Sequence, residues 1–303
     1  MPASPSDPVI AGVRVTHPER VLFPEQGLTK RALAEYYAGI AGRILPHVAR
    51  RPLSVVRCPR GRDGKCFYQK HRGEGFGPAV GGIEVEEKDG TVETYLMVRD
   101  AAGLVALVQA GALELHPWAS RGDRLERPDR LILDLDPGPG VAWPAVIEAA
   151  RDLRRRLGAL GLTSFVRTTG GKGLHVVAPL ERRASWERLK RFARALAEAV
   201  VAAAPDRYTA GAAKSERAGK IFIDWLRNAR GATAVASYST RARPGAPIAT
   251  PVSWDELPTL ESSAAHTVAN LPARLAALAT DPWAGFFTLR QSITRAMERS
   301  LEP

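Results

Sequence analysis

The chain has 303 residues, 45% of them hydrophobic, and a formal net charge of +11. This length and apolar content suffice for a folded core, and because no apolar run reaches about 18 residues we expect no membrane span. Residues 1–20 lack the basic start and apolar stretch of a secretory signal, so we expect a cytoplasmic protein. A basic balance of this size favours nucleic acid as a partner, although arginine supplies 35 of the 43 basic residues and biased composition alone could produce it.

The N-terminal part predicts a tail, one helix and several short strands. Residues 1–10 form the expected flexible tail. Apolar side chains recur at helical spacing over 29–45, where Thr29 is a candidate N-cap. Short strands are expected around 52–57, 65–70, 83–86 and 92–98, and they are followed by a short helix and a strand that carries His116.

Cys58 and Cys66 are the only cysteines, and they bound the stretch CPRGRDGKC. They could form a disulfide or half of a metal site. No second Cys/His pair with zinc spacing accompanies them, and a cytosolic chain rarely keeps a disulfide. We therefore expect reduced, structural thiols.

Strands alternate with helices in the second half. We expect strands at 131–136, 164–168, 174–178, 220–225 and 233–238. Pro144 opens a helix that runs to about 160, Ser185 caps a second one that ends near 204, and helical patterns return after 270. This mixture predicts an α/β fold of the mixed α+β kind, with mixed sheets flanked by helices. No domain boundary is visible, so we treat 1–303 as one catalytic domain with modules at about 11–120 and about 121–303.

Two aspartates interrupt the apolar strand LILDLDP. Because side chains alternate in a strand, the leucines face one way and Asp134 and Asp136 the other, with about 7 Å between the two aspartate Cα atoms. Like charges this close raise each other's pKa unless a cation lies between them, and carboxylate oxygens suit Mg²⁺ or Mn²⁺. The pair alone also fits a solvated strand end or two arginine-paired acids.

A third acid, Asp224, occurs in the stretch KIFIDW. Alternation places it on the face opposite to Ile221 and Ile223. Sites for phosphoryl transfer with two metal ions commonly gather about three carboxylates from adjacent strands. The alternative is an ordinary salt bridge to Lys220 or Arg227.

The stretch RTTGGKGLHVVAPL supplies a candidate anion-binding loop. Gly170 and the neighbouring glycines let the backbone approach a phosphate closely, Thr169 adds a hydroxyl and Lys172 adds charge. His175 faces away from its apolar neighbours and so towards the same site. The spacing is not that of a Walker loop, and glycine-rich hairpins without a ligand are common.

Two arginines downstream, Arg227 and Arg241, are candidate phosphate ligands. A guanidinium group donates two parallel hydrogen bonds to a phosphate. In a chain this rich in arginine, each of them could equally be a surface residue.

The motifs LILDLDPG, TTGGKGLHVVAPL, KIFIDWLRNARG and VASYSTRARPG, in this order, resemble the polymerase domain of bacterial ligase D, a family of the archaeo-eukaryotic primase superfamily. The resemblance runs from VRVTHPERVLFPEQGLTK to DPWAGF and so covers nearly the whole chain. Each motif by itself is unspecific, whereas the combination is specific. It implies a primase-type catalytic core.

The resemblance implies roles for individual residues. Asp134, Asp136 and Asp224 match the metal-binding, catalytic acids. The residues that match nucleotide-binding positions are Thr169, Gly170, Lys172, His175, Arg227, Arg241, His116, Phe67 and Tyr68. Those that match the site for a downstream 5′-phosphate are Arg20, Lys30 and His17. Thr169 stands where relatives often have serine and His17 where some have asparagine, while AAKSERAGK at 212–220 resembles a mobile basic loop that engages DNA ends.

The implied reaction is template-dependent and end-extending nucleotidyl transfer, which adds NTPs or dNTPs to DNA 3′ ends and fills gaps during bacterial non-homologous end joining in the nucleoid. Two Mn²⁺ or Mg²⁺ ions are the implied cofactors, both held by Asp134 and Asp136, with Asp224 on the ion that faces the primer. The implied partners are double-stranded DNA ends, gapped DNA with a 5′-phosphate, Ku, and ATP-dependent DNA ligase and nuclease modules. Because 1–303 contain no K-x-D-G ligase motif, these modules are either fused elsewhere or act in trans.

Three other functions stay open on the sequence. A metal-dependent nuclease or phosphatase could use the same acids, but it has no need of the TTGGKGLH loop and Arg241. A non-enzymatic module that binds DNA ends has no need of the acids. A stand-alone primase-type polymerase outside end joining is the nearest alternative, and it would start chains without a primer.

Overall fold

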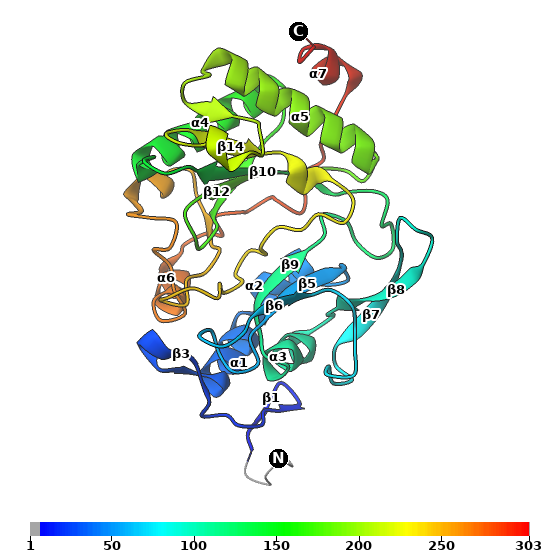
Figure 1. The fold of residues 1–303 in the computed structure, drawn as a ribbon, viewed down its shortest axis with the longest axis vertical. Helices are drawn as coiled ribbons and strands as arrows, with labels where there is room; N and C mark the ends of the chain where they lie inside the picture. Colours follow the sequence, from blue (N-terminus) through cyan, green and yellow to red (C-terminus); the bar gives the residue numbers. More distant parts are fainter. Residues whose placement is uncertain (1–6, 303) are drawn as a thin grey trace. The chain divides into compact units, whose positions relative to one another are not determined.

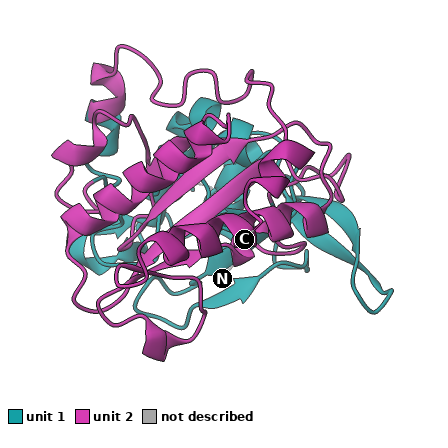
Figure 2. Cartoon of the chain, turned by 90° about the horizontal axis from the view of Figure 1, so that it is seen from above, with its two compact units in different colours: residues 1–118, 233–249, 266–273 teal, residues 119–232, 250–265, 274–303 magenta. Residues whose placement is uncertain are grey.

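The computed structural model describes residues 7–302, and these residues form two units, each assembled from several stretches of the chain (Figure 2). Unit 1 consists of the residues up to 118 together with 233–249 and 266–273. Unit 2 consists of 119–232, 250–265 and the residues from 274 onward. No described helix is both long enough and apolar enough to cross a membrane.

The first part of unit 1 forms two small hairpins and two helices. The hairpins pair β1 (Val9–Ile10) with β2 (Val13–Arg14) and β3 (Val21–Phe23) with β4 (Leu28–Thr29), and the helices are α1 (Lys30–Gly39) and α2 (Ala41–Val48). Of the tail expected at 1–10, residues 1–6 lie outside the described residues, and Val9–Ile10 form β1. The Thr29 cap is confirmed, because its hydroxyl accepts a hydrogen bond from the Ala32 N–H at 3.2 Å.

The prediction of one continuous helix over 29–45 is wrong. The chain leaves helical geometry at Ile40, where ψ is 7°, and α2 starts at the next residue. Gly39 precedes this break, and glycine is among the poorest helix formers because it loses the most backbone freedom on ordering.

The main sheet of unit 1 is built around β5 (Leu53–Arg57). This strand pairs with β6 (Phe67–Gln69), β8 (Val92–Met97) and β9 (Ala112–Pro117), and β8 also pairs with β7 (Gly81–Glu86). Helix α3 (Ala101–Gln109) connects β8 to β9 and buries almost its whole length. The strands predicted for this region and the strand that carries His116 are confirmed.

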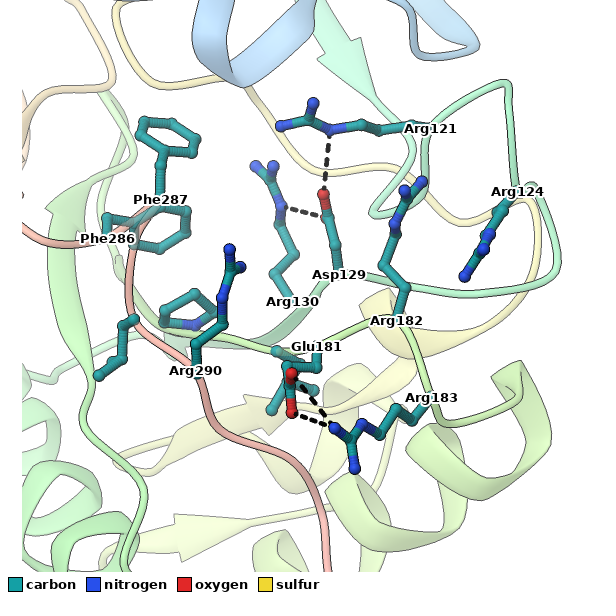
Figure 3. A pocket seen from close by; sticks show the side chains of 13 residues that line it. Arg121, Arg124, Asp129, Arg130, Glu181, Arg182, Arg183, Phe286, Phe287 and Arg290 are labelled. Carbon is teal, nitrogen blue, oxygen red and sulfur yellow. Dashed lines mark hydrogen bonds and ion pairs between the residues drawn. The ribbon is translucent and has the colours of Figure 1, made fainter.

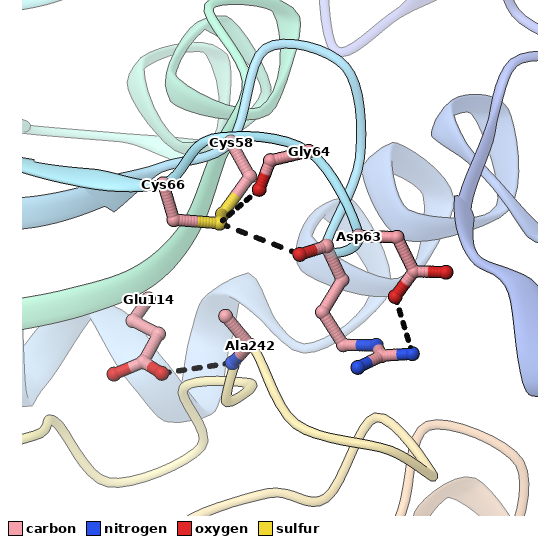
Figure 4. Close-up of a disulfide and its surroundings, with 7 residues drawn as sticks. Cys58, Asp63, Gly64, Cys66, Glu114 and Ala242 are labelled. Carbon is pink, nitrogen blue, oxygen red and sulfur yellow. Dashed lines mark hydrogen bonds and ion pairs between the residues drawn. A yellow bond between two sulfur atoms is a disulfide. The ribbon is translucent and has the colours of Figure 1, made fainter.

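The expectation of reduced cysteines is wrong, because Cys58 and Cys66 form a disulfide (Figure 4). Cys58 directly follows β5 and Cys66 directly precedes β6. These two strands are antiparallel neighbours, with Arg57 paired to Phe67, so the register alone brings the two cysteine Cα atoms to 4.3 Å. The pattern CPRGRDGKC therefore marks the turn of a β-hairpin.

The prediction of a strand at 233–238 is also wrong. Apart from one bridge between Trp118 and Thr233, this stretch has no ladder pairing. The stretch contacts β9 through isolated hydrogen bonds, such as the one from the Ala236 N–H to the Leu115 carbonyl at 2.8 Å. Tyr238 has a φ of +68°, in the left-handed region that interrupts a strand. Isolated backbone hydrogen bonds thus replace the expected ladder.

Unit 2 contains a six-stranded sheet in the order β13-β14-β10-β12-β11-β15. Its strands are β10 (Arg130–Pro137), β11 (Phe165–Thr168), β12 (Leu174–Pro179), β13 (Tyr208–Thr209), β14 (Ile221–Asp224) and β15 (Pro251–Val252). All neighbours are antiparallel except β13 and β14, which run parallel. The mixed α/β fold is confirmed.

Two long helices, α4 (Trp143–Ala159) and α5 (Trp186–Ala203), cover one face of this sheet (Figure 1). The predicted cap of α5 is confirmed, because the Ser185 hydroxyl accepts a hydrogen bond from the Arg188 N–H. The β10 leucines point into the core beneath both helices. Alternation then directs the aspartates of β10 to the opposite face. The short helices α6 (Leu271–Ala277) and α7 (Arg295–Arg299) match the helical pattern after 270.

Candidate active site

The three predicted acids lie on the face of the unit 2 sheet that α4 and α5 leave uncovered. In the antiparallel register, Asp134 of β10 pairs with Asp224 of β14 on one side and with His175 of β12 on the other. Asp136 follows two residues along β10 and therefore shares their face. The side chain of Asp134 is 15% exposed and that of Asp136 is 51% exposed, so the cluster opens to solvent at the end of β10.

Two arginines form ion pairs with these three acids. Nε of Arg227 lies 3.3 Å from an oxygen of Asp134 and 3.1 Å from an oxygen of Asp224, which is the salt bridge the sequence left open as an alternative. A guanidinium nitrogen of Arg217 lies 2.9 Å from Asp136. Burial and then the charge of Asp134 nevertheless raise the pKa of Asp136, and burial raises the pKa of Asp224. The negative charge of the cluster is therefore incompletely compensated.

This donor set fits a divalent cation. Carboxylate oxygens from adjacent strands are the ligands that Mg²⁺ and Mn²⁺ prefer, and a cation would relieve the repulsion that raises the pKa of Asp136. Within residues 7–302, no three acidic, histidine or cysteine side chains already stand close enough to share an ion. In this structure Arg227 and Arg217 occupy oxygens of the three acids.

His175 is held in one orientation by a residue that the sequence analysis missed. The guanidinium group of Arg167 donates to Nδ1 of His175 at 2.9 and 3.1 Å, so the ring proton is on Nε2, 3.4 Å from Asp134. Burial lowers the pKa of His175 to about 4, and the ring is neutral at pH 7. Arg167 occupies the register position opposite His175, a pairing that only the strand order reveals.

The predicted glycine loop is a tight turn between β11 and β12. The Thr169 hydroxyl donates to the Gly173 carbonyl at 3.0 Å, and Ser263, which the sequence did not single out, donates to the same carbonyl at 2.6 Å. A β-carbon at Gly173 would overlap the carbonyl oxygen of Leu135, which explains the glycine there. Gly170 has a φ of +64°. Lys172 is exposed at the tip, and its charge favours the ionised form of Asp136.

The loop at 212–220 folds back onto the acid-bearing strands. Arg217 covers the ring of Phe222 at 4.0 Å and bonds both Asp136 and the Ala212 carbonyl. A β-carbon at Gly138 would overlap the Arg217 carbonyl. Arg217 thus connects the predicted DNA-end loop to a candidate metal ligand.

A second cluster of predicted residues lies in unit 1, on β9 and on the stretch 233–249. His116 Nε2 lies 2.8 Å from Glu114, and Arg241 donates to Glu114 at 2.9 Å. The Ala242 N–H donates to the same carboxylate at 2.8 Å (Figure 4). Burial opposes the charge on Glu114, but the hydrogen bond from His116 and the charge of Arg241 outweigh it and lower its pKa to about 2. Glu114 was not singled out from the sequence, although it is an acid in an apolar strand, the same signal that pointed to Asp134 and Asp224.

The predicted aromatic pair lies at the same cluster. The rings of Tyr68 and His116 meet edge to face at 5.8 Å. Phe67 is 41% exposed and Tyr68 is 70% exposed, which is unusual for side chains of this size. Both are therefore available to a ligand.

The predicted 5′-phosphate residues come together in unit 1 at the start of α1. Lys30 is the first residue of α1, its Nζ donates to the Thr16 carbonyl at 3.0 Å, and its N–H donates to the Arg20 carbonyl at 2.8 Å. Burial and then the charge of Arg20 lower the pKa of Lys30 to about 8. His17 is exposed and has a φ of +51° in the turn that leads to Arg20.

Comparison with known proteins identifies the family. The model of the "LigD, primase-polymerase domain" matches residues 29–283. The multifunctional non-homologous end joining protein LigD of Pseudomonas aeruginosa is 41% identical over 300 residues, which is 99% of this chain and 36% of that protein. LigD of Mycobacterium tuberculosis strain H37Rv is 37% identical over 253 residues, which is 81% of this chain and 33% of that protein.

A solved structure agrees with these sequence matches. The polymerase domain from Mycobacterium tuberculosis Ligase D in complex with DNA superposes with a TM-score of 0.81 at 33% identity, covering 87% of this chain and 94% of that one. Fold and family define a DNA nucleotidyltransferase. The chain belongs to the LigD primase-polymerase domain family. It spans about a third of the length of these curated relatives.

Proposed function

We propose that the protein adds NTPs or dNTPs to DNA 3′ ends at the acid-bearing face of the unit 2 sheet. The observation that carries this proposal is the register of β10 and β14, which pairs Asp134 with Asp224 and sets Asp136 beside them. A sheet that only packs against helices has no use for three carboxylates on the face that these helices leave uncovered. A nucleotidyl-transfer site needs such a set to concentrate positive charge at the reacting phosphate.

Asp134, Asp136 and Asp224 would hold two Mn²⁺ or Mg²⁺ ions. Bound there, the ions supply the charge that acidifies the primer 3′-hydroxyl and neutralises the triphosphate. Arg227 has to leave Asp134 and Asp224 for this, and its guanidinium group is then free to bind a phosphate oxygen.

The neighbours of the acids would hold the triphosphate. His175 carries its ring proton on Nε2, from which it would donate a hydrogen bond to a phosphate oxygen. Arg167 fixes this tautomer by donating to Nδ1. Lys172 and the backbone of the turn at Thr169 and Gly170 face the same end of the strands. In unit 1, His116, Arg241 and the exposed rings of Phe67 and Tyr68 are the proposed contacts for the nucleotide and its base.

Arg20, Lys30 and His17 form the proposed site for the 5′-phosphate of a downstream strand. Backbone N–H groups and the dipole at the start of α1 favour an anion, and a terminal phosphate brings about two negative charges. This suits gap filling and end extension in bacterial non-homologous end joining, the process named in the LigD relatives. The partners would be DNA ends, Ku, and ATP-dependent ligase and nuclease modules, fused or in trans.

The test is incubation of the protein with a recessed, 5′-labelled duplex, Mn²⁺ or Mg²⁺, and nucleotides. We expect the primer to lengthen with the template. A shortened primer would indicate a nuclease, and release of phosphate from nucleotides without extension would indicate a phosphatase. Chain initiation on an unprimed template, with no preference for a 5′-phosphate, would instead support a stand-alone primase.

A further inference from the structure

A second cationic site lies in unit 2, at the end of the sheet opposite to the acids. Strand β10 begins at Arg130 and carries Asp136 near its other end, so these two residues are about 20 Å apart along the strand. Arg130 pairs in register with Pro179, the last residue of β12. At this end a pocket of about 440 Å³ opens (Figure 3).

Arginine dominates the lining of this pocket. Six arginines from separate stretches of the chain line it, namely Arg121, Arg124, Arg130, Arg182, Arg183 and Arg290. Three carboxylates offset part of their charge: Asp129 lies 3.0 Å from Arg130, Glu181 lies 3.2 Å from Arg183, and Asp123 lies 2.7 Å from Arg182. Six arginines against three acids leave an excess of three positive charges.

Two of the six arginines have no partner within residues 7–302. The guanidinium groups of Arg124 and Arg290 make no ion pair and no hydrogen bond there, and both side chains are exposed. Figure 3 shows both extending toward the space that the other arginines surround. The burial of Arg130, which is 3% exposed, adds a fixed charge at the back of the pocket. One buried cation and several exposed ones, spread over the pocket, are suited to several phosphate groups rather than to one.

An aromatic wall completes the pocket. Phe286 stacks on Trp283 with 4.6 Å between ring centroids and contacts Phe287 edge to face at 5.0 Å. The guanidinium group of Arg130 lies 5.7 Å from the centre of the Phe286 ring. Phe287 is thereby held in place while 43% of it stays exposed. An exposed, well-supported ring beside unpaired arginines presents a surface on which a nucleobase can stack.

We propose that this pocket binds single-stranded nucleic acid, with phosphates on Arg124 and Arg290 and a base against Phe287. A free nucleoside triphosphate is a poorer match, because it concentrates its charge and is usually cradled by main-chain N–H groups of a glycine loop. No glycine lines this pocket, and its arginines are spread over several segments. An acidic peptide would use the arginines but not the open face of Phe287.

Binding at this site does not depend on the proposed polymerase activity, so it is measured without nucleotide and in EDTA. The probe is a fluorescein-labelled oligothymidylate of about 12 nucleotides, a length typical of such sites, followed by anisotropy between about 50 and 200 mM salt. We expect Arg124→Ala/Arg290→Ala to weaken binding about tenfold and to flatten the salt dependence by about 1.4 in log–log slope, because each phosphate contact contributes about 0.7 for single strands. Phe287→Ala should weaken binding about fivefold or more through lost stacking.

The matched control is Arg151→Ala/Arg155→Ala on α4, which removes the same charge from exposed arginines outside the pocket. It should bind like wild type. A 5-iodouracil-substituted probe should crosslink to the peptide that contains Phe287. Equal affinity of the pocket variants and the control for the oligonucleotide would overturn the proposal. The proposal would also fail if the arginine variant bound more weakly while Phe287→Ala bound like wild type and no crosslink to Phe287 formed. If the protein extends no primer yet the pocket variants lose binding, the polymerase proposal fails and this one stands.

Discussion

Replacing Glu114 by glutamine tests the cluster that orients His116 and Arg241. The side chain keeps its size and loses only its charge. Since the pKa of Glu114 is lowered from 4.5 to about 2, the ionised form contributes about 3.4 kcal/mol to the free energy of unfolding near pH 7. A carboxylate with a lowered pKa gives stability that is complete above its unfolded value of 4.5 and is lost as the pH falls towards about 2. At about pH 3 we expect only about 1.4 kcal/mol to remain.

The assay is urea unfolding of wild type and Glu114→Gln at both pH values. The difference in unfolding free energy between the two proteins should narrow by about 2 kcal/mol on acidification. The kcat/KM for nucleotide near pH 7 should fall about tenfold, because Arg241 loses the negative charge that orients it. Glu35→Gln is the control, because Glu35 forms an exposed ion pair with Arg31 and should change stability by less than about 0.5 kcal/mol. A gap that stays constant with pH would refute the role assigned to Glu114.

Three further predictions concern the acids, the 5′-phosphate and the disulfide. Arg217→Ala should tighten Mn²⁺ binding, because Arg217 competes with the ion for Asp136. The electron spin resonance signal of free Mn²⁺ measures this affinity. Unchanged or weaker binding would argue against Asp136 as a metal ligand. Wild type should bind a gapped duplex with a 5′-phosphate more tightly than one with a 5′-hydroxyl below about pH 8, and this preference should decline above that pH as Lys30 loses its proton. In Lys30→Gln the preference should not change with pH. A wild-type preference that persists at high pH would exclude Lys30 as a phosphate ligand. Reduction of the Cys58–Cys66 bond should lower the free energy of unfolding by about 2.5 kcal/mol, because the bond closes a loop with a sequence separation of 8 and so restricts the unfolded chain. The stability of Cys66→Ser should not change with reductant. Equal stability of the wild type with and without reductant would contradict this prediction.

The sequence predicts those features of the site that follow from strand alternation. Asp134 and Asp136 face away from the leucines of β10 because a strand has a period of two, and the same rule orients Asp224. The pairing of β10 with both β12 and β14 is a property of the whole sheet, so the close approach of His175 and Asp224 to Asp134 needed the structure.

The residues that sequence reasoning missed share a physical cause. Arg167 is a buried charge whose partner His175 lies on the neighbouring strand. Glu114 is a buried charge that pairs with His116 on its own strand and with Arg241, which only the fold brings close. Ser263 acts through hydrogen bonds to Thr169 and to the Gly173 carbonyl, which are both distant from it in the sequence. The disulfide also depended on register, since it follows from the pairing of β5 with β6 rather than from the cellular compartment.

The most direct test of nucleotidyl transfer by these acids is single-turnover extension of a 5′-labelled primer at a one-nucleotide gap with a downstream 5′-phosphate. Wild type with Mn²⁺ or Mg²⁺ should lengthen the primer by the templated nucleotide. Asp224→Asn should leave it unextended while binding the gapped duplex as tightly, and in metal-free buffer it should be at least as stable as wild type because burial disfavours the charge of Asp224. Extension by folded Asp224→Asn at the wild-type rate, or a primer shortened by wild type, would contradict the account.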